Sequence, residues 1–125
     1  MIENVQTEKA PQAIGPYSQG VCANGFLFVS GQLPIDPATG VFKPGGIHEQ
    51  TYQVLINAKA IVEAAGLQMS QTVKATVFLA DMSDFAAMNE IYATFFTNPF
   101  PARAAFQVAR LPKDALVEIE LIVAK

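Results

Sequence analysis

Hydrophobic residues recur at helical spacing in two stretches of the chain. In the first, from His48 to Ala65, apolar side chains follow one another every three or four residues, which is the period of an amphipathic helix. Gly66 stands where a C-terminal cap is expected. Gln53, Asn57 and Glu63 fall between the apolar positions, so we expect them on the polar, outward side of this helix.

The second stretch predicts a shorter amphipathic helix. Ser83 is its expected N-cap, because a serine hydroxyl can accept a hydrogen bond from the first free N–H groups. The expected apolar face consists of Phe85, Met88, Ile91, Tyr92, Phe95 and Phe96. Asn98-Pro99-Phe100-Pro101 ends the helix.

Alternating side chains predict a strand from Thr72 to Leu79. Its expected inner side consists of Val73, Ala75, Val77 and Leu79. Five further segments are predicted as strands, namely Glu3–Thr7, Val21–Ala23, Phe26–Ser30, Arg103–Ala109 and Leu116–Ala124. Asn24-Gly25 predicts a hairpin turn, and the prolines and glycines between Pro34 and Gly46 predict an irregular loop.

The elements follow one another as three strands, a helix, a strand, a helix and two strands. No linker, repeat or low-complexity tract divides them, so residues 1–125 predict one domain. This order fits an α+β two-layer sandwich, in which one mixed sheet of about six strands carries both helices on one face. The other face of the sheet then needs a cover.

The composition supplies a reason to expect that cover from a second subunit. Hydrophobic residues make up 51% of the chain and charged residues 15%, whereas charged residues usually amount to about 25%. Too few charges are present to coat a monomer of this size. We therefore expect apolar surface to be buried between copies of the chain, at the open sheet face or its edge.

Several classes of function are disfavoured by what the sequence lacks. The net charge is −3 and the 8 Lys and Arg residues are scattered, which argues against nucleic-acid binding. One cysteine, Cys22, and one histidine, His48, provide neither an internal disulfide nor a metal ligand set, and both are interpreted as structural. No glycine-rich phosphate motif indicates a nucleotide cofactor.

The start of the chain lacks a signal sequence and no run approaches the ~18 apolar residues of a membrane span, so the cytosol is the expected location.

Arg103 is the first candidate for chemistry. It follows Pro101-Ala102 and opens an otherwise apolar strand. The planar guanidinium fork matches a carboxylate, so an arginine at the mouth of an apolar pocket is suited to hold a carboxylate substrate. The same position also fits a structural salt bridge or an arginine whose charged end reaches solvent.

Glu118 and Glu120 are the second candidates. They lie two residues apart in the last strand, so both side chains leave the same face. At a subunit junction one carboxylate could hold or deprotonate a water, because partial burial would raise its pKa. An ordinary solvent-facing strand explains the pattern equally well. Lys9, Arg110 and Lys113 are available as partners.

Two further segments have the composition of shaped loops. Residues 13–20 contain two glycines, a proline and a tyrosine. Ser30-Gly31-Gln32, at a strand end, could offer backbone N–H groups and a hydroxyl to an anion. Each signal alone is weak, because glycine at a strand end usually marks only a turn.

These motifs and several others follow one another along the chain in an order that is characteristic of one protein family. The motifs are Ala13–Gly20, Ser30-Gly31-Gln32, Asn57–Leu67, Thr76-Val77-Phe78, Asn89-Glu90-Ile91-Tyr92, Pro101-Ala102-Arg103, Val108–Asp114 and Glu118-Ile119-Glu120. In this combination the chain closely resembles the reactive intermediate deaminase A family, also called the YjgF-like or perchloric-acid-soluble protein family. The resemblance covers nearly the whole sequence.

The resemblance implies a chorismate-mutase-like subunit in a homotrimer with three clefts between subunits. It also implies a 2-iminobutanoate/2-iminopropanoate deaminase, which hydrolyses the reactive enamines and imines released by pyridoxal-phosphate-dependent dehydratases to 2-oxo acids and ammonia. No metal and no cofactor is implied. The partners are small 2-imino and 2-oxo carboxylates and further copies of the chain.

The resemblance also assigns roles to single residues. Arg103 corresponds to the carboxylate-binding arginine and Glu118 to the water-holding glutamate. The residues implied as the lining of the cleft are Tyr17, Ser30, Gly31 and Asn89. Ala105 replaces the cysteine that deaminases of the family usually carry there, which excludes thiol chemistry at that position.

Two alternative functions stay open. A trimer whose clefts bind 2-oxo acids without turnover would keep Arg103 and lack catalysis. An endoribonuclease is disfavoured by the acidic balance and by the absence of a histidine pair for acid–base work on RNA.

Overall fold

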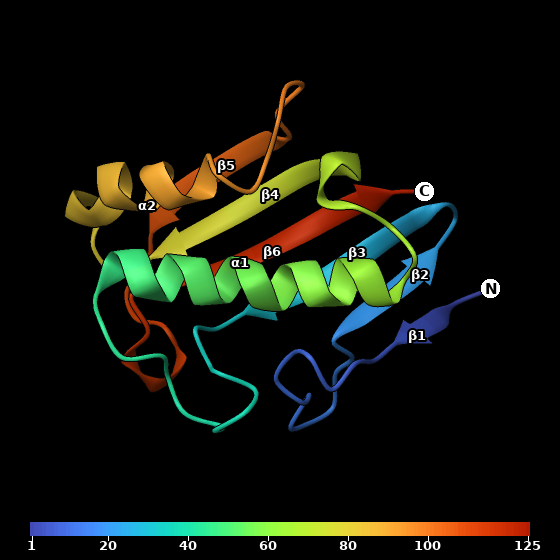
Figure 1. Cartoon of the computed structure of the whole chain (residues 1–125), viewed down its shortest axis with the longest axis horizontal. Coiled ribbons are helices and arrows are strands. Elements are labelled where there is room, and N and C mark those ends of the chain that lie inside the picture. Colours follow the sequence, from blue (N-terminus) through green and yellow to red (C-terminus); the bar gives the residue numbers. More distant parts are fainter.

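The computed structural model describes residues 1–125 as a six-stranded sheet with two helices lying across one of its faces (Figure 1). The strands are β1 (Glu3–Val5), β2 (Gly20–Ala23), β3 (Phe26–Gln32), β4 (Thr72–Leu79), β5 (Ala102–Gln107) and β6 (Val117–Ala124). The helices are α1 (Ile47–Ala64) and α2 (Phe85–Tyr92). The predicted α+β two-layer architecture is confirmed.

The sheet is mixed, with the strand order β1-β2-β3-β6-β4-β5. Every neighbouring pair is antiparallel except β4 and β5, which are parallel and joined through α2. In this order β5 is an edge strand, and the long interior strands β6 and β4 lie beneath the helices (Figure 1).

The β2–β3 hairpin turns at Asn24-Gly25, as the sequence predicts. Both residues have positive φ, 51° for Asn24 and 80° for Gly25. This is the geometry of a type I′ turn, whose twist matches that of the flanking strands. The turn thereby sets the register in which Cys22 pairs with Leu27.

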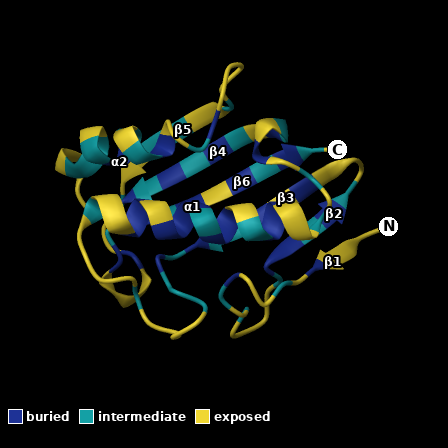
Figure 2. Cartoon of the chain, in the orientation of Figure 1, coloured by how far each residue is buried: buried dark blue, intermediate teal, exposed yellow.

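The core lies between the helices and the sheet (Figure 2). In β6 burial alternates strictly, with Val117, Ile119, Leu121 and Val123 directed inward. Leu55 and Ile61 of α1 are fully buried against this face. Cys22 is also buried, which agrees with its interpretation as a small structural residue. None of the helices combines the length and apolar character that crossing a membrane would require.

The expected alternation of β4 is wrong at its start. The register between β4 and β6 shifts between Thr72 and Lys74, which pair with Val123 and Ile122. Val73 is therefore the extra residue of a bulge and is 43% exposed, whereas Thr72 points inward. The rest of the strand alternates as predicted.

The predicted start and end of the second helix also need correction. Ser83 is not the N-cap of α2, because it lies in a short 3₁₀ turn where its N–H donates to the Asp81 carboxylate at 2.8 Å. The α-helix ends at Tyr92, and the chain continues in tighter turns in which the N–H of Phe95 donates to the Tyr92 carbonyl. Phe96 still reaches the core, at 4% exposure.

Two residues that we expected on the outward side of α1 are buried. Gln53 is 7% exposed and Asn57 is fully buried. The Asn57 amide donates to the carbonyls of Leu33 and Ile35 at 3.0 and 2.8 Å, and it accepts from Gln53 at 2.8 Å. Its polar side chain is inside because it satisfies the backbone of the irregular loop that follows β3.

Asn57→Ala is expected to destabilise the fold by about 2–4 kcal/mol, because it leaves two partly buried carbonyls without donors. The free energy of unfolding in urea measures this. Glu63→Ala, on the exposed side of the same helix, is the matched control and should change stability by less than about 0.5 kcal/mol. Equal effects of the two substitutions would contradict the anchoring role of Asn57.

Candidate functional site

Arg103 lies on the edge strand β5, opposite the buried Ala75 of β4. Paired residues of neighbouring strands share a face, so the arginine side chain extends on the helix-covered side. Its Nη1 donates to Asn89 Oδ1 at 2.5 Å. The guanidinium carbon lies 4.8 Å from the centre of the Tyr92 ring and 5.4 Å from that of Phe85.

No carboxylate neutralises this cation within the chain. The two ion pairs of the structure join His48 to Glu90 at 3.2 Å and Arg110 to Asp114 at 2.7 Å. The salt-bridge interpretation of Arg103 is therefore wrong. Four of the five N–H groups of a guanidinium have no acceptor here, and they are free for a ligand.

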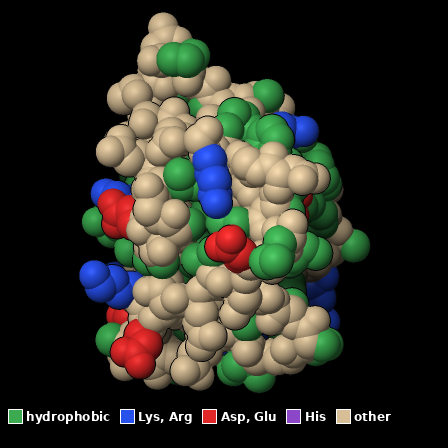
Figure 3. All heavy atoms as spheres, turned by 90° about the vertical axis from the view of Figure 1, so that its right-hand side faces the viewer, with side chains coloured by type: hydrophobic (Ala, Val, Ile, Leu, Met, Phe, Trp, Pro, Cys, Tyr) green, Lys and Arg blue, Asp and Glu red, His purple; other side chains and the backbone are tan.

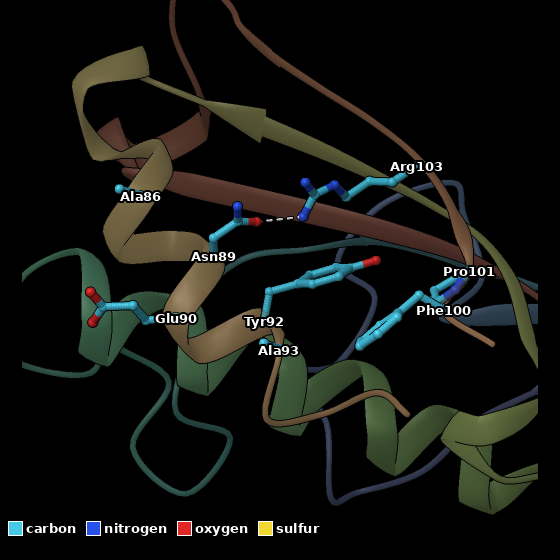
Figure 4. Close-up of a pocket in the computed structure, with 8 residues that line it drawn as sticks. All are labelled: Ala86, Asn89, Glu90, Tyr92, Ala93, Phe100, Pro101 and Arg103. Atoms are coloured by element: carbon cyan, nitrogen blue, oxygen red, sulfur yellow. Dashed lines mark hydrogen bonds between the residues drawn. The ribbon is translucent and has the colours of Figure 1, made fainter. Parts of the chain in front are cut away.

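An open hollow of about 740 Å³ adjoins the guanidinium, between α2 and the segment before β5 (Figure 4). The lining residues are Ala86, Asn89, Glu90, Tyr92, Ala93, Phe100, Pro101 and Arg103. The polar lining residues are Arg103, Asn89 and Glu90, and the Glu90 carboxylate pairs with His48 and not with Arg103. Tyr92, Phe100 and Pro101 contribute apolar surface. A cation beside an apolar wall suits a small organic anion.

Glu118 lies on the opposite, uncovered face of the sheet. It pairs with Phe78 of β4, while its neighbour Ile119 points into the core. Partial burial, with a smaller contribution from the charge of Glu120, raises the pKa of the Glu118 carboxyl. The prediction that Glu118 and Glu120 share a face is confirmed, because they pair with Phe78 and Thr76 of β4.

The position of the Glu118 carboxylate depends on Gly31. A Cβ at residue 31 would lie 2.0 Å from Glu118 Oε2, which no real contact allows. The expected cationic partner Arg110 does not reach Glu118, because it binds Asp114 through two hydrogen bonds of 2.7 and 3.2 Å. Nor do Lys9 and Lys113 form an ion pair with either glutamate.

Tyr17 and Ser30 lie near Gly31. Tyr17 is 55% exposed and lines a second hollow of about 290 Å³, to which Gly31 and Lys113 also contribute. Ser30 Oγ donates to the Ser18 carbonyl at 2.5 Å, so its proton holds the loop and is not available to a ligand.

Sequence reasoning missed the residue that shapes this loop. Gln19 is 2% exposed, and its amide bonds to Thr7, Ala10 and Pro11 at 2.7–3.3 Å. A glutamine beside a glycine carries no periodic signal. Only the folded loop reveals its role, which is to satisfy a non-repetitive backbone.

Ala105 contributes backbone rather than side chain. Its methyl group packs against the core. The N–H of Val108 donates to the Leu79 carbonyl of β4, and since successive N–H groups of a strand alternate in direction, those of Arg103 and Ala105 point out of the open edge. The free N–H of Ala105 therefore lies two residues after Arg103, which has no carboxylate partner.

The candidate residues thus form two groups that a single chain keeps apart. Arg103, Asn89 and Ala105 belong to the helix-covered side and the β5 edge, whereas Glu118 and Gly31 belong to the open face. The sheet lies between the two groups. One chain by itself does not bring the guanidinium and the carboxylate to a common ligand.

The open face itself is rich in apolar side chains. Phe26, Phe28, Val73 and Phe106 are each 40–45% exposed. Glu118, Phe78 and Phe106 form one row across the strands, and the two phenylalanine rings meet edge to face with centroids 5.3 Å apart. Viewed from the hairpin end, charged side chains of both signs are scattered over the surface and form no extended basic patch (Figure 3). No group of three or more His, Cys, Asp or Glu side chains is arranged to hold a metal ion.

Comparison with known sequences places this geometry among relatives. The family model described as Endoribonuclease L-PSP matches residues 7–125. A RutC family protein from Pyrococcus horikoshii is 56% identical over 125 residues, which are 100% of this chain and 99% of the relative. The 2-iminobutanoate/2-iminopropanoate deaminase from Capra hircus is 52% identical over 118 residues, which are 94% of this chain and 86% of that protein.

Solved structures match the fold over nearly the entire chain. RidA from the Antarctic bacterium Psychrobacter sp. superposes with a TM-score of 0.94 at 47% identity, covering 98% of this chain and 99% of that one. TdcF from E. coli, solved with bound serine, superposes with a TM-score of 0.93 at 45% identity, covering 98% of each chain. The six-stranded sheet with two helices on one face is therefore shared with these proteins.

Proposed function

Because this chain belongs to the RidA/YjgF family, whose members match the Endoribonuclease L-PSP model, we propose that it hydrolyses 2-imino acids to 2-oxo acids and ammonia. The substrates are 2-iminopropanoate and 2-iminobutanoate. The observation that carries the proposal is the Arg103 guanidinium, which has no carboxylate partner and lies beside a hollow with an apolar wall. Relatives named as deaminases of these imines, at about 52% identity, support the same reaction.

In the proposed reaction, Arg103 binds the substrate carboxylate and the outward N–H of Ala105 provides a second donor beside it. Asn89 restrains the arginine, and Tyr17 and Gly31 line the space next to Glu118. A protonated imine is already electrophilic, so the protein contributes mainly orientation and base catalysis.

Glu118 is proposed to hold and activate the water. The water oxygen adds to C2 of the iminium group while Glu118 accepts a proton, which gives a tetrahedral carbinolamine. Glu118 then returns the proton to the nitrogen. As the C–N bond breaks and ammonia leaves, the carboxylate of Glu118 accepts the proton of the C2 hydroxyl, so that the C2 carbonyl forms, and this proton passes to the released ammonia to give ammonium. The raised pKa of Glu118 suits this exchange, because a base is most effective when its pKa is near the working pH.

The separation of Arg103 from Glu118 by the sheet supports a site formed between subunits of a homotrimer. In this arrangement Arg103 of one subunit meets Glu118 of the next, and the apolar open face is covered. The high share of hydrophobic residues agrees with such burial. The mass of the particle in solution, measured by sedimentation or native mass spectrometry, tests the trimer.

Mixed oligomers test the shared site directly. Arg103→Ala and Glu118→Gln chains are unfolded together and refolded as a 1:1 mixture. We expect about a quarter of the sites to regain both residues, and so about a quarter of wild-type turnover. Each variant refolded alone is the control. If both residues act within one chain, the mixture stays as inactive as its components.

Gly31→Ala tests the placement of the carboxylate. The new methyl group would displace Glu118, so we expect turnover to fall about 10- to 100-fold while the fold is retained. Gly46→Ala is the matched control, because a Cβ at Gly46 meets no atom within 4 Å. Wild-type kinetics in the Gly31 variant would contradict the placement of the water by Glu118.

The activity itself is tested in a coupled assay. A pyridoxal-phosphate-dependent serine or threonine dehydratase generates the imines, and the purified protein should accelerate the release of ammonia and 2-oxo acid. Binding of 2-oxobutanoate without any acceleration would favour the noncatalytic binding function. RNA cleavage that survives repurification and disappears in Arg103→Ala would favour the endoribonuclease.

A further inference from the structure

The Arg103 guanidinium is held by an aromatic pair that the proposed reaction does not yet use. Phe85, Asn89 and Tyr92 occupy positions i, i+4 and i+7 of α2, so one stripe of the helix faces the arginine. Asn89 bonds one N–H at 2.5 Å. The two rings contact the cation with centroids 5.4 and 4.8 Å from its central carbon.

These contacts restrain the cation without using its hydrogen-bond donors. A cation attracted by a ring face keeps its N–H groups free, whereas an ion pair with a carboxylate would occupy the fork. A structural arginine on an exposed edge strand usually has an acidic partner or extends into solvent. Here the arginine lies over two rings, and four N–H groups have no acceptor in the chain.

The platform beneath the arginine is rigid. Tyr92 is 5% exposed and packs against Phe96 with ring centroids 4.6 Å apart, and Phe85 also packs against the core. The position of both rings therefore follows from the hydrophobic core. Small neighbours, Ala86 and Ala93, leave the hollow beside the guanidinium open (Figure 4).

The Tyr92 hydroxyl has no part in this arrangement. Its oxygen is buried and has no hydrogen-bond partner. Burial raises the pKa of Tyr92, and the charge of Arg103 acts in the opposite direction. The neutral phenol thus contributes its ring face, and its oxygen is an unsatisfied buried group.

We propose that Phe85 and Tyr92 are positioning residues for Arg103, whose guanidinium their ring faces fix so that its free N–H groups are presented to a ligand carboxylate. The identity of that ligand rests on the proposed function, and the positioning role itself rests on the contacts of α2 with the arginine. Loss of a ring face should weaken carboxylate binding, whereas loss of the hydroxyl alone should not.

The test is a double-mutant cycle read by calorimetric binding of 2-oxobutanoate to the intact protein. Tyr92→Phe should keep the dissociation constant within about twofold, because it retains the ring. Tyr92→Leu should raise the dissociation constant about 5- to 30-fold. In the Arg103→Ala background the same Tyr92→Leu change should have no further effect, because the cation that it acts through is gone.

Two additional measurements separate positioning from simple packing. In the NMR spectrum, ring currents should shift the Arg103 side-chain protons upfield in the wild type and in Tyr92→Phe, and less so in Tyr92→Leu. If Tyr92→Leu fails to fold, Phe85→Leu takes its place, because residue 85 is only partly buried. Phe85→Leu should also raise the dissociation constant. Equal losses in Tyr92→Phe and Tyr92→Leu, or additive losses in the Arg103→Ala background, would overturn the positioning role.

The outcomes also distinguish this inference from the proposed function. If the effects of Tyr92→Leu and Arg103→Ala are not additive and the protein does not accelerate imine hydrolysis, the deaminase function is rejected and the positioning role is retained. Normal turnover with additive effects in the cycle would reject the positioning role and retain the deaminase.

Discussion

Arg103→Ala is expected to lower kcat/KM for imine hydrolysis by roughly 1.5 to 3.5 powers of ten, because removing a charged partner of a bound carboxylate costs about 2–5 kcal/mol. The side chain is exposed on the edge strand and packs on rings that have their own support in the core, so the fold should survive. The coupled dehydratase assay measures the effect, and circular dichroism confirms folding.

Two further variants serve as comparisons for Arg103→Ala. Arg103→Lys keeps the charge and loses the planar fork, so its activity should lie between those of the wild type and the alanine variant. Arg110→Ala is the matched control, because Arg110 is an exposed arginine already bound to Asp114. Ammonia release at the wild-type rate by Arg103→Ala would eliminate the proposed carboxylate site.

Glu118→Gln is expected to lower kcat about 10²- to 10⁴-fold while binding of 2-oxobutanoate changes little, because the amide cannot accept the proton of the attacking water. Glu120→Gln, two residues away on the same face, should have a much smaller effect. Steady-state kinetics and calorimetry together separate the two quantities. A Glu118 variant that loses affinity and keeps kcat would reverse the assignment and make Glu118 a binding residue.

The raised pKa of Glu118 adds a pH signature to the same variant. The base acts in its ionised form, so wild-type kcat/KM should rise with pH through the raised pKa, and Glu118→Gln should lack this rise.

The contribution of Glu118 to folding stability should change with pH in the opposite direction. A carboxyl whose pKa is higher in the folded state contributes stability below its unfolded value, and the contribution is lost as pH rises through the folded pKa. The gain in Tm of Glu118→Gln over wild type should therefore be larger at about pH 7 than at about pH 4.

Much of the fold follows from local pattern. The 3.6-residue period identifies α1 and most of α2, and the two-residue period identifies β4 and β6, because a face buried against a core must be apolar wherever the backbone repeats. The Asn24-Gly25 turn is equally local, since its two positive φ angles depend on its own residues. The α+β class and the location of Glu118 and Glu120 on one face of the sheet follow from the same periods.

Other features depend on segments that meet only in the folded chain. Asn57 looks like a surface residue of α1 until the carbonyls of Leu33 and Ile35 are placed beside it. Val73 looks like an inner strand residue until the register with β6 produces a bulge. In both cases a distant backbone segment decides whether the side chain is buried.

The candidate site divides in the same way. The sequence by itself determined which residues are able to do chemistry, because a guanidinium and a pair of carboxylates are properties of residue type. Only the tertiary structure decided that Arg103 lies over the rings of α2 without an acidic partner, and that Glu118 lies on the far side of the sheet beside Gly31. The physical reason is that strand order and register determine which face and which neighbours each side chain has, and these depend on contacts between residues far apart along the chain.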